Sequence, residues 1–183
     1  MPCAYDEKSN RHLAPLNEDD KILIYERQVK EWFLNRASRL LRGKRNNFIV
    51  FMIAISYIEG VEQYKRGESS EPDRGNRIQG RSKEFFRDSI KKIFNLSEDD
   101  NTLDDFYSQV RCGLFHNGMT KDKVIINNGF QNPIDFSEQD KIKINPKLFL
   151  SKVKDDFKSY IRQLKDPRNI DERDKFDRMY KIV

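Results

Sequence analysis

The sequence predicts an all-α fold, a helical bundle of about five helices with a short β-hairpin insertion. Apolar residues recur at intervals of three and four through five long segments, which is the period of an amphipathic helix. Turn signals built from Gly, Asn and Pro separate these segments. Two short runs rich in Ile and Val between the fourth and fifth segments predict the insertion.

The chain of 183 residues has the length of one domain with short extensions. We treat residues 1–17, which show no sustained periodicity, as an N-terminal extension. Residues 18–165 form the helical domain, and residues 118–145 are a β/loop insertion within it. Residues 166–183 are a densely charged C-terminal tail with a weak apolar pattern. This pattern leaves open a short helix on the outside of the bundle or a contact with a partner.

The first two helices are predicted on either side of a basic turn, residues 42–45. Asn17 can act as an N-cap with acidic residues behind it, and helical spacing of apolar residues continues to about Gly43. The segment from Asn47 to Lys65 is apolar on almost every side before it becomes polar. Such a segment is typical of a helix at the centre of a bundle.

A polar loop and two further helices follow. Residues 67–80 have loop composition and almost no apolar content. A third helix is predicted from about Ser82, as its N-cap, to Phe94. A fourth is expected to start near Thr102, whose hydroxyl can cap it, and to stop at Asn117-Gly118.

The insertion and the closing helix complete the predicted domain. The runs 124–130 and 141–144 are expected to pair as short strands or a hairpin. Asn145 followed by Pro146 is a strong helix start, and apolar spacing continues for about five turns to Leu164. This fifth helix closes the core.

Composition excludes several classes of protein. The two cysteines, Cys3 and Cys112, suggest neither a disulfide framework nor a zinc site, and no acidic metal cluster of recognisable spacing is present. The longest apolar run, Phe48–Ile58, is well short of the roughly 20 residues that span a bilayer. We therefore expect a cytoplasmic protein with no cofactor, no metal and no membrane partner. The net charge of +5 is by itself weak support for nucleic-acid binding.

One segment, residues 110–118, carries residues suited to catalysis. His116 titrates near neutral pH and can exchange protons, whereas Arg111 stays cationic and can bracket a phosphate with two donors. In a metal-free route, the imidazole removes the proton from a ribose 2′-hydroxyl and that oxygen attacks the adjacent phosphorus. The guanidinium stabilises the extra negative charge. The pair is therefore suited to cleaving RNA and would spare DNA.

The spacing of the two residues adds a geometric constraint. On an ideal α-helix, five residues place Arg111 and His116 about 140° apart, so they do not share a face. Either the last turn unwinds and one chain brings both groups to a phosphate, or a two-fold dimer brings two copies of this helix end together. We favour the dimer, whose cleft would hold two arginines and two histidines.

The segment from Arg111 to Gly118 resembles the R-x(4–6)-H signature of HEPN domains, here with four intervening residues. The order of helices, basic loop, motif helix and insertion also resembles that family over roughly residues 18–165. The resemblance implies a HEPN-like helical bundle, with Arg111 and His116 as the catalytic pair of an endoribonuclease. Active members of the family often have Asn, Asp or His directly after the arginine, where this chain has Cys112.

The resemblance also implies partners. HEPN nucleases pair their motif helices across a homodimer, cleave single-stranded RNA to 2′,3′-cyclic phosphate ends, and occur in toxin–antitoxin and antiviral systems. We accordingly expect RNA, a second copy of the chain and an antitoxin or other regulatory protein as partners.

Weaker candidates support this pair. Asn117, Glu59 and Cys112 are possible supporting residues, and Glu59 is placed to orient Arg111 or His116. Three arginines form a basic loop that could follow a nucleic-acid backbone: Arg74, Arg77 and Arg81.

Two other interpretations remain open. The first is a catalytically silent HEPN-like module that binds nucleotide, RNA or a protein partner through the same cleft. The second is a structural helical dimer in which His116 caps a helix and Arg111 pairs with an acidic neighbour such as Asp104 or Glu59. Cleavage and binding measurements distinguish the three.

Overall fold

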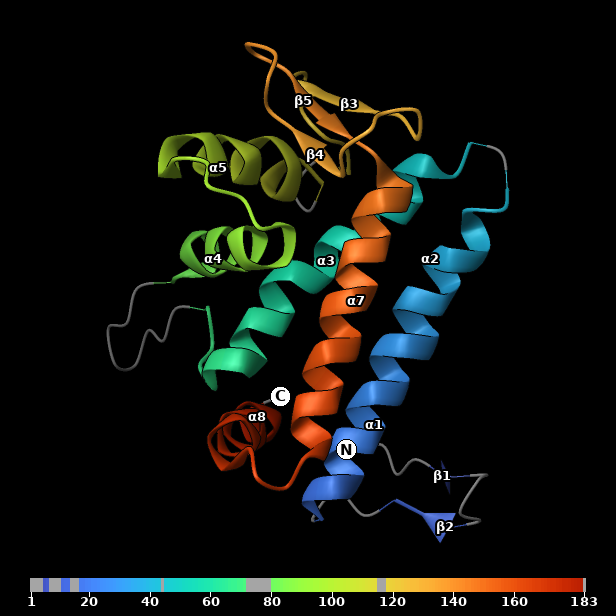
Figure 1. The fold of residues 1–183 in the computed structure, drawn as a ribbon, viewed down its shortest axis with the longest axis vertical. Helices are drawn as coiled ribbons and strands as arrows, with labels where there is room; N and C mark the ends of the chain where they lie inside the picture. Colours follow the sequence, from blue (N-terminus) through green and yellow to red (C-terminus); the bar gives the residue numbers. More distant parts are fainter. Residues whose placement is uncertain are drawn as a thin grey trace.

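The fold is mainly helical with a small three-stranded sheet at one end (Figure 1). The computed structural model describes residues 5–6, 11–13, 17–43, 45–71, 80–114 and 118–182. The predicted all-α fold is confirmed in its coarser form, since the fold is mostly helical. The details of two helix starts and of the sheet differ from the predictions.

The first helical segment runs through three continuous elements, α1 (Glu18–Arg27), η1 (Gln28–Leu34) and α2 (Asn35–Leu40). The Asn17 side chain accepts a hydrogen bond from the Asp19 amide at 2.9 Å, which confirms the predicted N-cap. Element η1 is a π-helix, whose turn is wider than that of an α-helix.

Helix α3 (Asn47–Arg66) lies at the centre of the bundle and contacts α7, α4 and α8. Figure 1 shows it passing behind α7 and reaching α4 and α8 at its far end. Val50, Phe51 and Ile58 are fully buried, as expected for a helix covered on several sides. The helix ends at Gly67, which adopts φ +68°, a left-handed conformation that glycine tolerates without strain.

The next two helices, α4 (Ser82–Phe94) and α5 (Asp100–Phe106), correct two predicted caps. Helix α4 begins at Ser82 itself, and the residue in the cap position, Arg81, makes no capping hydrogen bond. In α5 the cap is Asp99 and not Thr102, because the Asp99 carboxylate accepts from the Thr102 amide at 2.8 Å. The predicted caps at Ser82 and Thr102 were therefore wrong, the latter because a better acceptor stands three residues earlier.

Strands β3 (Val124–Ile126), β4 (Ile134–Asp135) and β5 (Ile142–Ile144) form a sheet in the order β3-β5-β4. The predicted hairpin between 124–130 and 141–144 is wrong, since β3 pairs with β5 in parallel. The short strand β4 pairs antiparallel with the other edge of β5. The connection between β3 and β5 is long enough to hold β4 and to reverse direction twice, which a hairpin turn cannot do.

Helix α7 (Pro146–Lys165) starts as predicted, with the Asn145 side chain accepting from the Leu148 amide at 3.1 Å. The Asn145 amide nitrogen donates to the Phe130 carbonyl at 2.6 Å, so the same side chain also fixes the loop between β3 and β4. Below this start, the Phe149 ring packs edge-on against Phe51 of α3 at a centroid distance of 5.1 Å. Asn145 thus joins the sheet to the central helix pair.

Helix α8 (Ile170–Ile182) lies within the segment taken as a charged tail. Phe176 is fully buried, with its ring centroid 5.4 Å from those of both Tyr25 and Tyr64. Arg173 donates to the Leu164 carbonyl at 2.8 Å and pairs with Glu18 at the start of α1. Helix α8 therefore belongs to the common core and does not lie free of the bundle.

The described part of the N-terminal extension contains a two-stranded sheet and one buried side chain. Strands β1 (Tyr5–Asp6) and β2 (Arg11–His12) pair antiparallel, and the Leu13 side chain that follows is fully buried. Within the described ranges, no helix has the combination of length and apolar character that crossing a membrane requires.

Replacing Phe176 by Ala tests whether α8 is part of the cooperative core. Because the ring is fully buried among aromatic neighbours, we expect the free energy of unfolding to fall by about 3–5 kcal/mol in a denaturant titration. The control is Asp174→Ala, an exposed position on the same helix, which should change it by less than about 0.5 kcal/mol. Equal, small effects of both substitutions would show that α8 unfolds independently.

Candidate functional site

The candidate site is built around an ion pair between Arg111 and Glu59. Arg111 belongs to η2 (Tyr107–Cys112), the π-helical continuation of α5, and Glu59 lies on α3. The Arg111 Nε and Nη2 atoms lie 3.2 and 3.1 Å from Glu59 Oε2, and the two side chains are 26% and 15% exposed. Of the two acidic neighbours suggested by the sequence, Glu59 is thus the partner. Asp104 instead pairs with Lys83.

This ion pair forms part of the wall of a pocket of about 240 Å³. The pocket lies between α3 and the segment that follows its C-terminal end, and most of its lining residues are polar. Its lining residues are Ile55, Ser56, Glu59, Gly60, Gln63, Ser70, Glu71 and Arg111. Arg111 is the one cationic side chain among these lining residues, and it shares the pocket with two carboxylates, those of Glu59 and Glu71.

The Glu59 carboxylate is held in place by a buried serine. Ser70, which is 1% exposed, donates its hydroxyl to Glu59 Oε1 at 2.6 Å, and its amide donates to the Gln63 side chain at 3.1 Å. Glu59 therefore presents one oxygen to Ser70 and the other to Arg111. The sequence analysis missed Ser70 and Gln63. Gln63 stands four residues after Glu59, so helical spacing could have found it, whereas no local signal marks Ser70.

Arg111 is the second-last residue of the π-helix η2, which ends at Cys112. His116 lies beyond η2 and outside the described residues, so the angle of about 140° between Arg111 and His116 stays a prediction. Arg111 also lies over the Tyr107 ring, with its Cζ atom 5.7 Å from the ring centre. Burial raises the pKa of Tyr107, against a smaller opposite effect of Arg111.

The chain returns tightly against η2 after the motif. The Lys121 amide donates to the Gln109 carbonyl at 2.9 Å, and Gly113 is buried beneath the returning backbone. Gly118, with φ +69°, donates to the Leu114 carbonyl at 3.1 Å. The left-handed glycine fits the predicted helix stop at this point.

Several predicted site residues lie outside the described residues: His116, Asn117, Arg74 and Arg77. Of the predicted basic loop, Arg81 is described, and it forms ion pairs with Glu68 and Glu84 at 2.9 and 2.6 Å. Hydrogen bonds from Arg81 and then Arg66 lower the pKa of Glu84 to about 2. The Arg81 charge is thus engaged with carboxylates of the protein.

Cys112, next to Arg111, is a free, half-buried thiol. It lies beside the ion pair and not in the pocket lining.

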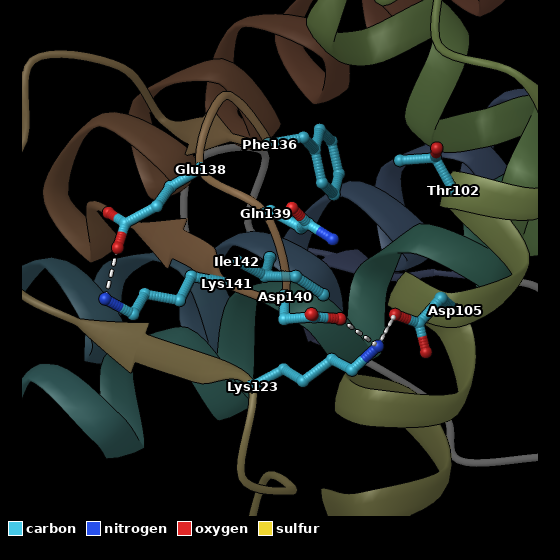
Figure 2. A pocket seen from close by; sticks show the side chains of 9 residues that line it. All are labelled: Thr102, Asp105, Lys123, Phe136, Glu138, Gln139, Asp140, Lys141 and Ile142. Atoms are coloured by element: carbon cyan, nitrogen blue, oxygen red, sulfur yellow. Dashed lines mark hydrogen bonds and ion pairs between the residues drawn. The ribbon is translucent and has the colours of Figure 1, made fainter.

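A second pocket, of about 170 Å³, lies between α5 and the loops of the sheet (Figure 2). Lys123 reaches Asp105 at 3.1 Å and Asp140 at 3.4 Å, and Lys141 pairs with Glu138. Each of these charged side chains is engaged in an ion pair with another that lines the pocket (Figure 2), and we assign no chemistry to it.

In the part of the chain that the structure describes, no three His, Cys, Asp or Glu side chains are grouped as ligands of a metal ion. Comparisons with known proteins returned no match: no protein-family model, no curated protein and no solved structure matches the chain.

The close approach at Gly113 makes a testable prediction. A Cβ at this position would lie 2.6 Å from the Met119 carbonyl oxygen, so Gly113→Ala must displace backbone and should lower the free energy of unfolding by about 1–3 kcal/mol. Gly60→Ala is the matched control, because a Cβ at this position meets nothing within 4 Å. The substitution also replaces a flexible glycine in the interior of a helix. That variant should gain about 0.5–1 kcal/mol. A thermal melt of both variants measures these changes in stability. A Gly113→Ala variant as stable as the wild type would refute the close packing at Gly113.

Proposed function

We propose that the protein is a metal-independent endoribonuclease that cleaves single-stranded RNA and leaves 2′,3′-cyclic phosphate and 5′-hydroxyl ends. The observation that carries this proposal is the fixed position of Arg111. Its guanidinium lies on the wall of a polar pocket, held by a carboxylate that is itself held by a buried serine, five residues before His116 in the sequence. Preorganised cations of this kind stabilise charge that develops in a transition state.

Each residue has a defined role in the proposed reaction. His116 acts as general base and removes the proton from the ribose 2′-hydroxyl, whose oxygen then attacks the adjacent phosphorus. The bond between phosphorus and the 5′ oxygen breaks, and the leaving 5′ oxygen takes up a proton from water. Arg111 binds the phosphate oxygens and stabilises their added negative charge. A guanidinium has five N–H donors, so Arg111 can hold Glu59 and a phosphate at the same time. Glu59 is a positioning residue that fixes the plane of the guanidinium.

The proposed enzyme acts as a homodimer under the control of a protein partner. In the dimer, two copies of the motif helix end line one basic cleft. A ribonuclease harms its own cell when it is unrestrained, so the proposal includes an antitoxin or another regulatory protein, in a toxin–antitoxin or antiviral setting. These partners rest on the resemblance to HEPN domains.

A second function is favoured by the same ion pair. If Arg111 serves mainly to join η2 to α3 through Glu59, the domain is catalytically silent and binds nucleotide, RNA or a protein partner. Such a module would bind RNA without cutting it. Cleavage assays therefore separate the two functions.

The test is a time course of single-stranded RNA cleavage in EDTA. The wild type should cut the RNA, and Arg111→Ala and His116→Ala should each lower the rate by at least about 100-fold, because each removes a group that acts in the transition state. Chemical analysis of the ends should find 2′,3′-cyclic phosphates. Arg178→Ala, an exposed arginine on α8, is the matched control and should leave the rate unchanged.

Folding of every variant is checked by circular dichroism before the assay. Cleavage that persists in Arg111→Ala and His116→Ala would identify a contaminating nuclease or another site. RNA binding with no cleavage by the wild type would discard the nuclease and support the silent module.

A further inference from the structure

One short segment of the chain carries all of its net charge. Residues 28–49 contain six Lys and Arg against a single acidic residue, so the segment has a net charge of +5. This equals the net charge of the whole chain, so the positive and negative charges of the remaining residues cancel. Five of these six cations lie in the part of the chain that the structure describes. All five are exposed and make no ion pair with another described residue: Lys30, Arg36, Arg39, Arg42 and Arg45. The local charge is therefore available to an anionic partner.

The same region exposes most of the large apolar side chains found at the surface of the described chain. Trp32 is 62% exposed and Phe33 is 44% exposed, both on η1. Phe48, Ile49 and Met52 are exposed on the first turns of α3, which follows α2 after the basic turn (Figure 1). Exposed aromatic groups concentrated in one region mark an interaction site.

Aromatic and basic side chains alternate on one side of this helix. Arg36 and Arg39 lie three residues apart on α2 and share a stripe. Trp32 stands only two residues before the end of the π-helical η1, so the four residues from Trp32 to Arg36 still make about one turn. Phe33 lies three residues before Arg36 and reaches into the groove beside α3. We call the set Trp32, Phe33, Arg36, Arg39 and Arg42 the aromatic–basic surface.

A groove connects this surface with the pocket at Arg111. The groove, of about 170 Å³, is almost entirely apolar, with Val29 and Phe33 on one side and α3 on the other. Ser56 and Gly60 line both this groove and the Arg111 pocket. The groove therefore adjoins the aromatic–basic surface at Phe33 and the Arg111 pocket at Ser56 and Gly60.

We infer that the aromatic–basic surface binds single-stranded RNA, with bases stacked on Trp32 and Phe33 and phosphates held by Arg36, Arg39 and Arg42. Proteins bind single strands by this combination, since every base has a face that can stack and every linkage carries a phosphate. The choice of RNA over DNA rests on the proposed function. The stacking and phosphate contacts rest on the surface alone.

Two other occupants fit this surface less well. A second copy of the chain, docked face to face, would bring two segments of charge +5 together without anions between them. A membrane helix keeps its cations off the inserted face, whereas Arg36 and Arg39 share the stripe of Trp32. RNA accommodates aromatic and cationic groups side by side.

Trp32 is the single tryptophan of the chain, so its fluorescence reports on this surface directly. The wild-type protein in EDTA is titrated with a 2′-O-methyl oligouridine of about 12 nucleotides, which offers bases and phosphates but no 2′-hydroxyl nucleophile. We expect saturable quenching of the Trp32 emission. The logarithm of the affinity should fall linearly with the logarithm of the salt concentration.

Variants are compared through the anisotropy of a labelled oligouridine of the same kind. Arg36→Gln combined with Arg39→Gln should weaken binding roughly tenfold or more at low salt and reduce the salt slope by about 1.4. Lys152→Gln combined with Arg178→Gln removes two exposed cations that have no ion pair among the described residues, and should leave both values unchanged. Trp32→Ala should weaken binding by about 5- to 100-fold, and Trp32→Phe should restore most of it.

Three results would overturn the inference. The first is an equal loss of affinity in the two double variants. The second is saturation of oligouridine binding without a change in Trp32 fluorescence. The third is Trp32 fluorescence that is quenched by raising the protein concentration or by adding anionic vesicles, and not by oligouridine. The oligouridine cannot be cut by the proposed mechanism, so these readouts do not depend on catalysis. Binding without cleavage of ordinary RNA would leave the surface standing and remove the nuclease. If the Arg36/Arg39 double variant cleaved ordinary RNA as fast as the wild type, the nuclease would stand and the aromatic–basic surface would be removed as its RNA-binding site.

Discussion

The burial of α3 is the constraint on which the rest of the structure depends. Its side chains at Val50, Phe51 and Ile58 are fully buried, and α7, α4 and α8 all pack against it. Only one stripe of the helix remains uncovered, and it carries Met52 and the groove residues Ser56 and Gly60. The candidate site lies along this stripe because the other sides of α3 are occupied, and the aromatic–basic surface adjoins the stripe at the groove beside Phe33.

The Glu59–Arg111 ion pair brings residues of α3 and η2 together at the candidate site. Glu59 comes from the uncovered side of α3, and Arg111 reaches it from η2 across a distance of about 3.1 Å. The pair is partly buried, so loss of one partner would leave a poorly solvated charge. Ser70 and Gln63 add hydrogen bonds that restrict the carboxylate, and the guanidinium is thereby oriented toward a pocket. A fixed guanidinium loses less entropy on binding a phosphate than a mobile one does.

Local signals predicted the helices well, and long-range contacts account for the differences. Asn17 and Asn145 act as caps as predicted, because a cap depends on residues within the same turn. At α5 two cap-forming residues compete, and Asp99 is used instead of Thr102. The parallel pairing of β3 with β5 depends on the two-residue strand β4, which is too short to give a periodic signal.

The candidate site was predicted only in part, because long-range contacts also determine which residues meet there. The sequence offered Glu59 and Asp104 as partners of Arg111, and only the packing of η2 on α3 selects Glu59. The π-helical turn of η2 has no sequence signature, so the α-helical spacing expected through this segment could not reveal it. Ser70 lies in a loop, and tertiary contact alone reveals it.

The central claim is that RNA is cut by attack of its own 2′-hydroxyl at a phosphate bound to Arg111. The most direct measurement compares two RNAs that differ by one 2′-O-methyl group at the linkage the protein cuts, under single-turnover conditions in EDTA. The account predicts that the substituted linkage is not cut, while the substituted RNA competes for the protein as well as the unmodified RNA does. Cutting of both linkages at the same rate would contradict it, since the nucleophile would then be water and not the ribose.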